Sequence, residues 1–380
     1  MKILHTSDWH LGCQLYGFDR LEEQAAMLDT IIDIAGREKP DAFIVSGDVF
    51  DSTQPPNRAY RLFVDKMEGL RRLCPETVIV IIAGNHDSAT RHELFRTPWL
   101  RDNIHLVGYA DAAEPDKLSI HIPGKGTVAA VPYVHPRFMA DDYFTAAVER
   151  AAAATPDGLP VVLMAHLALA DSEADIGTAV GHIDCLPPKV LGDGYDYAAL
   201  GHIHRRYIAA GAPKARFCGT PLMVSFDEPG EHGVEIVGIA SRGAVPEVRH
   251  VEIPACRPLL TIPETAADFE ECLKVLAAFP DDIPAYLRLH VRAAGISSDA
   301  PFRARKALDG KQAVFCAFKF AEEESERSDL RRNIAVDDFL NISPEEVARM
   351  YAAGRGIEFD DELAGLFAEA VAQSESDERS

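Results

Sequence analysis

One local pattern recurs up to about residue 250: an apolar, β-branched run that ends in polar side chains. Runs of this kind are typical of strands buried on both faces of a sheet. Helical patterns lie between the first three runs, at 21–37 and 57–73. Alternating strands and helices favour an α/β or α-β-β-α sheet core. The runs are KILHTSDWH (2–10), DAFIVSGDVFD (41–51), TVIVIIAGNHD (77–87), PVVLMAHL (160–167) and YDYAALGHIH (195–204).

The pattern changes in the last third of the chain. Two alternating segments within 230–253 predict a closing hairpin, and a strand-helix-strand order within 257–294 predicts a small α+β unit. The helix of that unit is expected at 265–279. A charged linker follows from residue 321. Two helices with apolar stripes, at 343–354 and 360–373, are then predicted to end the chain.

Composition limits the classes of protein that the chain can belong to. The chain has 380 residues, 47% of them hydrophobic, which is enough for a sizeable core and two or three domains. There is no apolar run of about 18 residues and no leader segment, so we expect a cytoplasmic, nucleoid-associated protein without a membrane span. The seven cysteines form no C-x-x-C pair, which predicts reduced thiols and excludes a thiolate zinc site.

The formal net charge of −22 argues against a nucleic-acid partner at first sight. Residues 321–380 contain 17 acidic and 6 basic side chains, however, so a net charge of −11 belongs to this tail alone. We therefore assign the acidic tail to partner docking or to solubility. The remaining carboxylates include the candidate chemistry.

Polar side chains that can bind metal follow each of the five predicted strands. Ligands collect beyond the carboxyl ends of strands in such sheets. Carboxylates, imidazoles and one carboxamide suit Mn²⁺, Fe²⁺, Zn²⁺ or Co²⁺, and they are too many for one ion. Two ions about 3.5–4 Å apart, sharing one aspartate, would use all of them and suit attack on a phosphate ester. The candidates are Asp8, His10, Asp48, Asn85, His86, His166, His202 and His204.

Strand geometry supports such a site, although each motif alone has a simpler explanation. Alternation along a strand would point Asp8 and His10 to one face, and it would do the same for His202 and His204. His202 and His204 could then each complete the ligand set of a different ion. Taken singly, D-x-H is a weak motif, a lone histidine on an apolar strand is commonly a core residue, and GNHD resembles a turn. Because all five motifs occur at predicted strand ends of one chain, together they predict a metal site.

The series D-x-H, G-D-x-x-D, G-N-H-D, A-H and G-H-x-H resembles that of the calcineurin-like metallophosphoesterases. Together with GTPLMVSFDE, it is most similar to their DNA-nuclease branch, densely over 1–227. The resemblance implies a β-sandwich flanked by helices, with a smaller α+β capping domain and C-terminal helices. It also implies boundaries: a nuclease domain at 1–254, a DNA-binding capping domain at 255–320, and a linker with partner-docking helices at 321–380.

The same resemblance implies roles for single residues. His86 would be the catalytic histidine that helps to expel the leaving ribose oxygen, and Asp51 stands where archaeal and eukaryotic relatives have a second histidine, as a group that supports a ligand. Two divalent ions would be bound, with Mn²⁺ as the preferred metal. The first would be held by Asp8, His10, Asp48 and His204, and the second by Asp48, Asn85, His166 and His202.

The function that the resemblance implies is a 3′→5′ double-strand exonuclease and a single-strand or hairpin endonuclease. Its partners would be DNA and an SMC-like coiled-coil ATPase, with two nuclease chains in a heterotetramer. The terminal helices would either dock that partner or fold back on their own domain. Two alternatives share the motifs: a phosphoesterase acting on small phosphodiesters such as cyclic nucleotides, and a non-catalytic repair scaffold.

Overall fold

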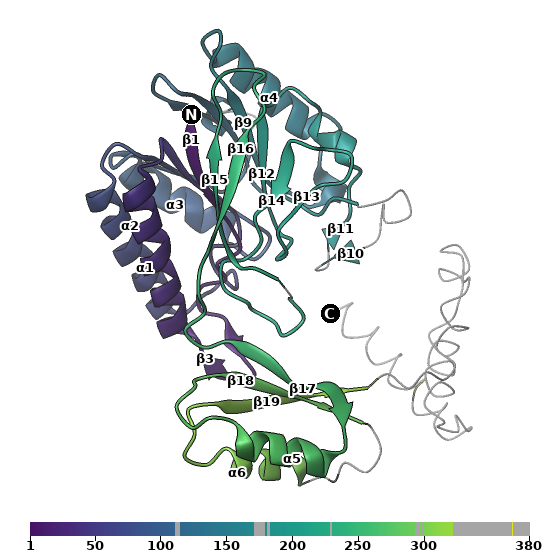
Figure 1. Ribbon diagram of the computed structural model, residues 1–380. Helices are drawn as coiled ribbons and strands as arrows, with labels where there is room; N and C mark the ends of the chain where they lie inside the picture. Colours follow the sequence, from purple (N-terminus) through teal and green to yellow (C-terminus); the bar gives the residue numbers. More distant parts are fainter. Residues whose placement is uncertain are drawn as a thin grey trace. The chain divides into compact units, whose positions relative to one another are not determined.

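The computed structural model (Figure 1) describes residues 1–110, 115–170, 179–180, 183–228, 230–292, 297, 299–321 and 367. Contacts within the chain divide it into two units, Met1–Ala321 and Glu322–Ser380. The helices expected at 343–354 and 360–373 lie outside the described residues, except for position 367. A boundary at 254/255 stays a prediction within the first unit.

Two six-stranded sheets form the core of the first unit. In the first sheet, the order is β16-β15-β1-β4-β5-β6, with parallel pairing from β1 to β6 and antiparallel pairing of β15 and β16. The two antiparallel strands form the expected closing hairpin. The strands are β1 (Lys2–Thr6), β4 (Ala42–Ser46), β5 (Val78–Ile82), β6 (Ile104–Val107), β15 (Gly233–Gly238) and β16 (Glu247–Glu252).

The second sheet has the order β13-β14-β12-β9-β8-β7. The strands from β8 to β14 are parallel, and the two edge strands are antiparallel to their neighbours. The strands are β7 (Ser119–Ile122), β8 (Gly126–Val131), β9 (Val161–His166), β12 (Tyr197–Gly201), β13 (Tyr207–Ile208) and β14 (Ala215–Phe217). Short pieces complete the unit: β2 (Gln14–Leu15), β3 (Phe18–Asp19), β10 (Ala179–Val180), β11 (Ile183–Asp184) and 3₁₀ turns at Pro115–Leu118, Pro136–Phe138 and Pro188–Leu191.

The sheets pack face to face, and helices cover their outer faces (Figure 1). One core cluster joins the sheets through residues such as Ile44 and Leu163, and a second joins the first sheet to its helices through Phe43 and Met27. The predicted α-β-β-α core is therefore confirmed. The helices are α1 (Leu21–Glu38), α2 (Asn57–Leu73) and α3 (Ala89–Leu100) beside the first sheet, and α4 (Tyr143–Ala154) beside the second.

The segment from Leu259 forms a smaller α+β unit, which we call the cap (259–320). Its three parallel strands have the order β17-β18-β19, and helices connect them. The expected helix at 265–279 is wrong at its start, because the β17 strand continues to Ala267, which pairs with Val291 of β18. The cap elements are β17 (Leu259–Ala267), α5 (Phe269–Ala278), β18 (Tyr286–Val291), α6 (Ala300–Ala307) and β19 (Val314–Phe320).

The cap has its own hydrophobic core, and a separate hydrophobic cluster connects it to the rest of the unit. Leu289 and Cys272 belong to the core of the cap, while Tyr286 and Leu259 pack with Leu15 and Phe226 in a cluster that joins the cap to the sheet part.

All seven cysteines are free thiols. Within the described part of the chain, no helix combines the length and the apolar character needed to cross a bilayer.

Candidate metal centre

Apart from His166, which is the last residue of β9, the predicted site residues lie in the loops that follow the parallel strands. The β1 strand ends at Thr6 and β12 ends at Gly201, so strand alternation cannot orient the side chains beyond them. Alternation is therefore the wrong reason, although Asp8 and His10 do share one group of side chains and His202 and His204 belong to different groups. The orientation comes instead from left-handed backbone, with positive φ angles at four non-glycine residues: Asp8 (53°), His10 (45°), Asp48 (50°) and His202 (101°). Such strain is typical of functional sites.

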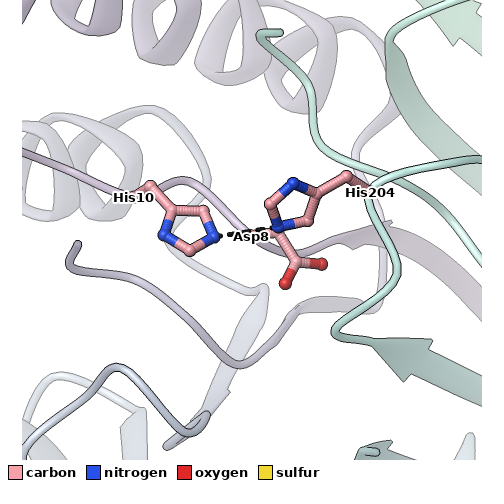
Figure 2. Close-up of side chains that lie close together, drawn as sticks. All are labelled: Asp8, His10 and His204. Carbon is pink, nitrogen blue, oxygen red and sulfur yellow. Dashed lines mark hydrogen bonds between the residues drawn. The ribbon is translucent and has the colours of Figure 1, made fainter. Parts of the chain in front are cut away.

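Three overlapping groups of side chains place possible ligand atoms within 4.8 Å of one another. The first is Asp8, His10 and His204, which converge in Figure 2. The other two share Asp48 and are His10, Asp48 and His86, and Asp48, His166 and His202. Because Asp48 belongs to two groups and His10 also to two, the groups form one continuous cluster that can hold divalent cations.

In the first group, the Nε2 atoms of His10 and His204 are 3.1 Å apart. His10 Nε2 is also 3.8 Å from a carboxylate oxygen of Asp48. The carboxylate of Asp8 is fixed by its neighbours, since it accepts hydrogen bonds from Ser7 Oγ at 2.5 Å and from the main-chain N–H of His202 at 3.0 Å. The backbone of one candidate ligand thus positions the side chain of another.

Asn85 lies beside the group of Asp48, His166 and His202. Its Oδ1 atom lies 2.9 Å from Nε2 of His166 and 3.2 Å from Nδ1 of His202. His166 Nε2 is also 3.4 Å from a carboxylate oxygen of Asp48. Carboxylate, amide and imidazole acceptors therefore point at one small volume.

Outer hydrogen bonds prepare these imidazoles to bind a cation. His166 Nδ1 donates to the carbonyl of Ser46 at 2.8 Å, and His204 Nδ1 donates to Glu228 at 2.7 Å. When Nδ1 carries the proton of a neutral imidazole, Nε2 faces inward with a lone pair. The inward nitrogen of His166 then faces oxygens of Asn85 and Asp48, and that of His204 faces Nε2 of His10, so that a proton or a metal ion between these acceptors would stabilise the arrangement. The donor set thus fits divalent metal.

The pKa values of the buried groups reflect the same excess of acceptors. Burial alone would lower the pKa of His166, but the carboxylate of Asp48 raises it to about 9. Burial alone would raise the pKa of Asp48, yet the His166 imidazole holds it well below its usual range. Burial also acts to lower the pKa of His10, but the hydrogen bond to Asp51 and the nearby carboxylates raise it. A cation would therefore stabilise this cluster, and a divalent ion can take the place of the proton.

Two glycines make room for this packing. A Cβ atom at Gly84 would lie 2.2 Å from Oδ1 of Asp48, and one at Gly201 would lie 2.0 Å from the carbonyl oxygen of Ser46. Neither glycine has a positive φ angle. Their role is thus close approach between neighbouring loops and not a special backbone conformation.

His86 and Asp51 lie at the exposed rim of the cluster. The ring of His86 is 4.9 Å from that of His10, and its Nδ1 donates to the carbonyl of Asp51 at 2.9 Å. The main-chain N–H of His86 donates to Asp48 at 2.8 Å. The Asp51 carboxylate lies 3.5 Å from Nδ1 of His10. The exposed imidazole of His86 is therefore available to a substrate that approaches the cluster.

Sequence reasoning assigned no role to two carboxylates that organise the centre. Asp87, the last residue of GNHD, is buried and accepts hydrogen bonds from the main-chain N–H groups of Val49, Phe50 and Gly84. Glu228, the last residue of GTPLMVSFDE, accepts from His204. The available signal was their place inside motifs already recognised, but the partners of each are distant in sequence.

Comparison with known proteins defines the class. The family model described as calcineurin-like phosphoesterase matches residues 1–206, more than half of the chain. This range contains all eight metal-site candidates that the sequence predicts. The chain therefore belongs to the calcineurin-like phosphoesterase family.

Within this family, the chain is similar to bacterial proteins named as the SbcD component of the nuclease SbcCD. The relative from Rhodobacter capsulatus is 32% identical over 315 residues, covering 74% of this chain and 77% of the relative. The relative from Escherichia coli K12 is 30% identical over 315 residues, covering 77% and 78%. The relative from Bacillus subtilis is 29% identical over 404 residues and covers both chains completely. The similarity thus extends beyond the family domain into the cap.

Proposed function

We propose that this chain is a metal-dependent DNA phosphodiesterase, the nuclease component of a complex with an SbcC-like coiled-coil ATPase. Its activities would be 3′→5′ double-strand exonuclease and single-strand or hairpin endonuclease, used in DNA repair, recombination and replication at the nucleoid. The observation that carries this proposal is the convergence of side chains from five strand ends around Asp48. Support also comes from the relatives named as nuclease components, which match most of the chain.

We assign the ligands from the groups above. Asp48 would be shared by two ions, and the mixed imidazole and oxygen donors suit Mn²⁺, Fe²⁺, Zn²⁺ or Co²⁺. We propose Mn²⁺ as the preferred metal because the family resemblance implies it. Asp8, His10 and His204 would complete one ion site, and Asn85, His166 and His202 the other. Bound ions supply Lewis-acid activation of water and neutralise charge on the phosphate.

The protein's own contribution to the reaction is orientation and proton transfer. His86 is exposed beside His10, and its ring is oriented by the Nδ1 hydrogen bond to the carbonyl of Asp51. The Nε2 atom of the protonated ring is then free to give its proton to the ribose oxygen as the phosphodiester bond breaks. Asp51 additionally orients His10. His86 is thus the proposed catalytic residue, and Asp51 a positioning residue.

We further propose that two nuclease chains associate in the complex. Exposed apolar side chains gather on α3, where Leu94 is 70% exposed and Phe95 46% exposed. Phe95 lines an apolar pocket of about 530 Å³ between α2 and α3, together with Tyr60, Phe63 and Trp99 among others. Exposed apolar surface of this kind is typical of association sites. The oligomeric state of the purified chain tests this part separately.

The experiment for the main proposal uses purified protein, Mn²⁺, labelled duplex DNA and bis-p-nitrophenyl phosphate, with and without the ATPase partner and ATP. We expect both substrates to be cleaved. His86→Ala should reduce turnover by a factor of about 10²–10⁴ while Mn²⁺ content stays unchanged. His121→Ala, at an exposed position of β7, is the matched control and should behave as wild type.

Three outcomes would contradict the proposal. Cleavage of the small ester alone would favour a phosphoesterase for small phosphodiesters. No cleavage of either substrate, even with partner and ATP, would favour a non-catalytic scaffold. Loss of Mn²⁺ from His86→Ala would show that His86 is a ligand.

A further inference from the structure

A single loop, residues 219–228, touches both the metal cluster and the cap. On the cluster side, Thr220 Oγ1 donates to the carbonyl of Asp8 at 2.8 Å, and Thr220 N donates to the carbonyl of His204 at 3.1 Å. Glu228 accepts from His204 Nδ1 at 2.7 Å with one oxygen and from Val224 N at 2.9 Å with the other. The orientation of the His204 ring therefore depends on the conformation of this loop.

On the cap side, the same loop is held by Arg288 of the β18 strand. The Arg288 residue is 8% exposed, and its guanidinium donates to the carbonyl of Phe226 at 3.3 Å and pairs with Asp227 at 2.8 Å. It also lies over the Phe226 ring, 5.0 Å from the centroid, and donates through Nε to Thr261 of the cap at 3.1 Å. One side chain thus joins two strands of the cap to the loop.

The chemistry of arginine explains why this contact is specific. A guanidinium has five N–H donors in one plane and can serve a carbonyl, a carboxylate and a hydroxyl together, which an ammonium cannot do in the same geometry. Asp227 is 72% exposed, so the ion pair by itself contributes little to stability. The buried bond to the Phe226 carbonyl and the stacking on the Phe226 ring therefore define the position of the loop.

We propose that Arg288 is a positioning residue through which the seated cap sets the orientation of His204. The path runs from β18 through Phe226 and Asp227 to Glu228 and then to the imidazole. The inference rests on the proposed function, because it assumes that His204 binds one of two ions. Its consequence is that movement of the cap, when DNA or the partner binds, alters the site of His204 while Asn85, His166 and His202 keep theirs.

A purely structural role for Arg288 makes a different prediction. It would lower the stability of the cap and leave both ion sites intact in the folded protein. The two roles are therefore separated by measuring the two ion sites individually, in addition to nuclease activity.

The test is a Mn²⁺ titration of the full chain, followed by calorimetry and by electron paramagnetic resonance, which distinguishes paired from single Mn²⁺. We expect Arg288→Ala to weaken one ion site about ten-fold, the size typical of residues that orient a ligand, and to leave the other unchanged. The signal of the coupled pair should decrease and that of a single ion should increase. Arg288→Lys should recover part of the affinity.

Two further variants control for damage to the cap. Arg292→Ala removes an exposed arginine of the same domain, which pairs with Asp268 and Glu271 inside the cap and should leave both ion sites at wild-type affinity. Asp227→Ala removes only the exposed ion pair and keeps the bond to the Phe226 carbonyl, so it should weaken the same ion site less than Arg288→Ala does. A small loss of affinity in Asp227→Ala and a larger one in Arg288→Ala, both at one ion site, would identify the path.

The inference is overturned if Arg288→Ala binds two ions with wild-type affinity, or if it weakens both sites equally. Failure of the proposed function has a different signature. In that case the wild-type chain itself would bind no pair of ions or would cleave neither substrate, whatever residue stands at 288.

Discussion

Asp87 offers the sharpest test of how the centre is held together. Its buried carboxylate accepts through Oδ2 from the N–H groups of Val49 at 3.1 Å and Gly84 at 3.0 Å, and through Oδ1 from that of Phe50 at 2.9 Å. Val49 and Phe50 follow Asp48 directly, and Gly84 precedes Asn85. One side chain therefore ties together the two loops that carry candidate ligands.

The effect of Asp87→Asn can be worked out from these contacts. The amide keeps one oxygen but replaces the other with an NH₂ group, so at least one of the three N–H donors faces another donor. A buried unsatisfied donor lowers stability by about 1–3 kcal/mol. The remaining bonds also lose their charged acceptor, which weakens them by roughly 1 kcal/mol in total. We expect the free energy of unfolding to fall by about 2–4 kcal/mol.

Urea unfolding of the metal-free chain measures this change directly. Asp33→Asn, at an exposed position of α1, is the matched control and should stay within about 0.5 kcal/mol of wild type. Mn²⁺ affinity of Asp87→Asn should fall as well, because both loops move. If Asp87→Asn unfolded at the same urea concentration as wild type with an unchanged slope, the three hydrogen bonds would not hold the loops as described.

Three more changes test other contacts. Gly84→Ala should lower Mn²⁺ affinity and destabilise the fold by about 1–3 kcal/mol, because its Cβ would lie 2.2 Å from Oδ1 of Asp48. Gly69→Ala is the control: its Cβ would meet open space in α2, and thermal unfolding should show a gain in stability of up to about 1 kcal/mol. Burial lowers the pKa of His5 to about 4, so His5 stays neutral in the folded chain and stability is lost as pH falls from 6.5 towards 4. Between pH 7 and pH 5 this loss should be about 2 kcal/mol, and His5→Gln should remove it; an unchanged pH slope in the variant would contradict the assignment. Tyr286→Phe removes the hydroxyl that donates to buried Glu23 at 2.6 Å, and urea unfolding should show a loss of about 1–2 kcal/mol. Tyr16→Phe, at an exposed position, should show no such loss.

Much of the fold could be predicted because its signals are local. Each parallel strand of the centre is a short apolar run, and each run ends in polar residues a few positions later, so strand, strand end and candidate ligand are read from the same segment. The closing hairpin and the first two strands of the cap were also predicted from local patterns, whereas α6 and β19 were not. The predicted helix at 265–279 began too early because pairing of Ala267 with Val291, 24 positions away, extends the strand.

The sequence alone determined which side chains gather at the centre and which chemistry they suit, since residue type and strand order are written along the chain. Tertiary structure decided how those side chains are oriented. Left-handed backbone at Asp8, His10 and Asp48 replaces strand alternation, and the hydrogen bonds of Asp87 and Arg288 join segments 38 and 62 positions apart. Such contacts depend on how loops from different strands meet after packing, and no local pattern of hydrophobic and polar residues encodes that meeting.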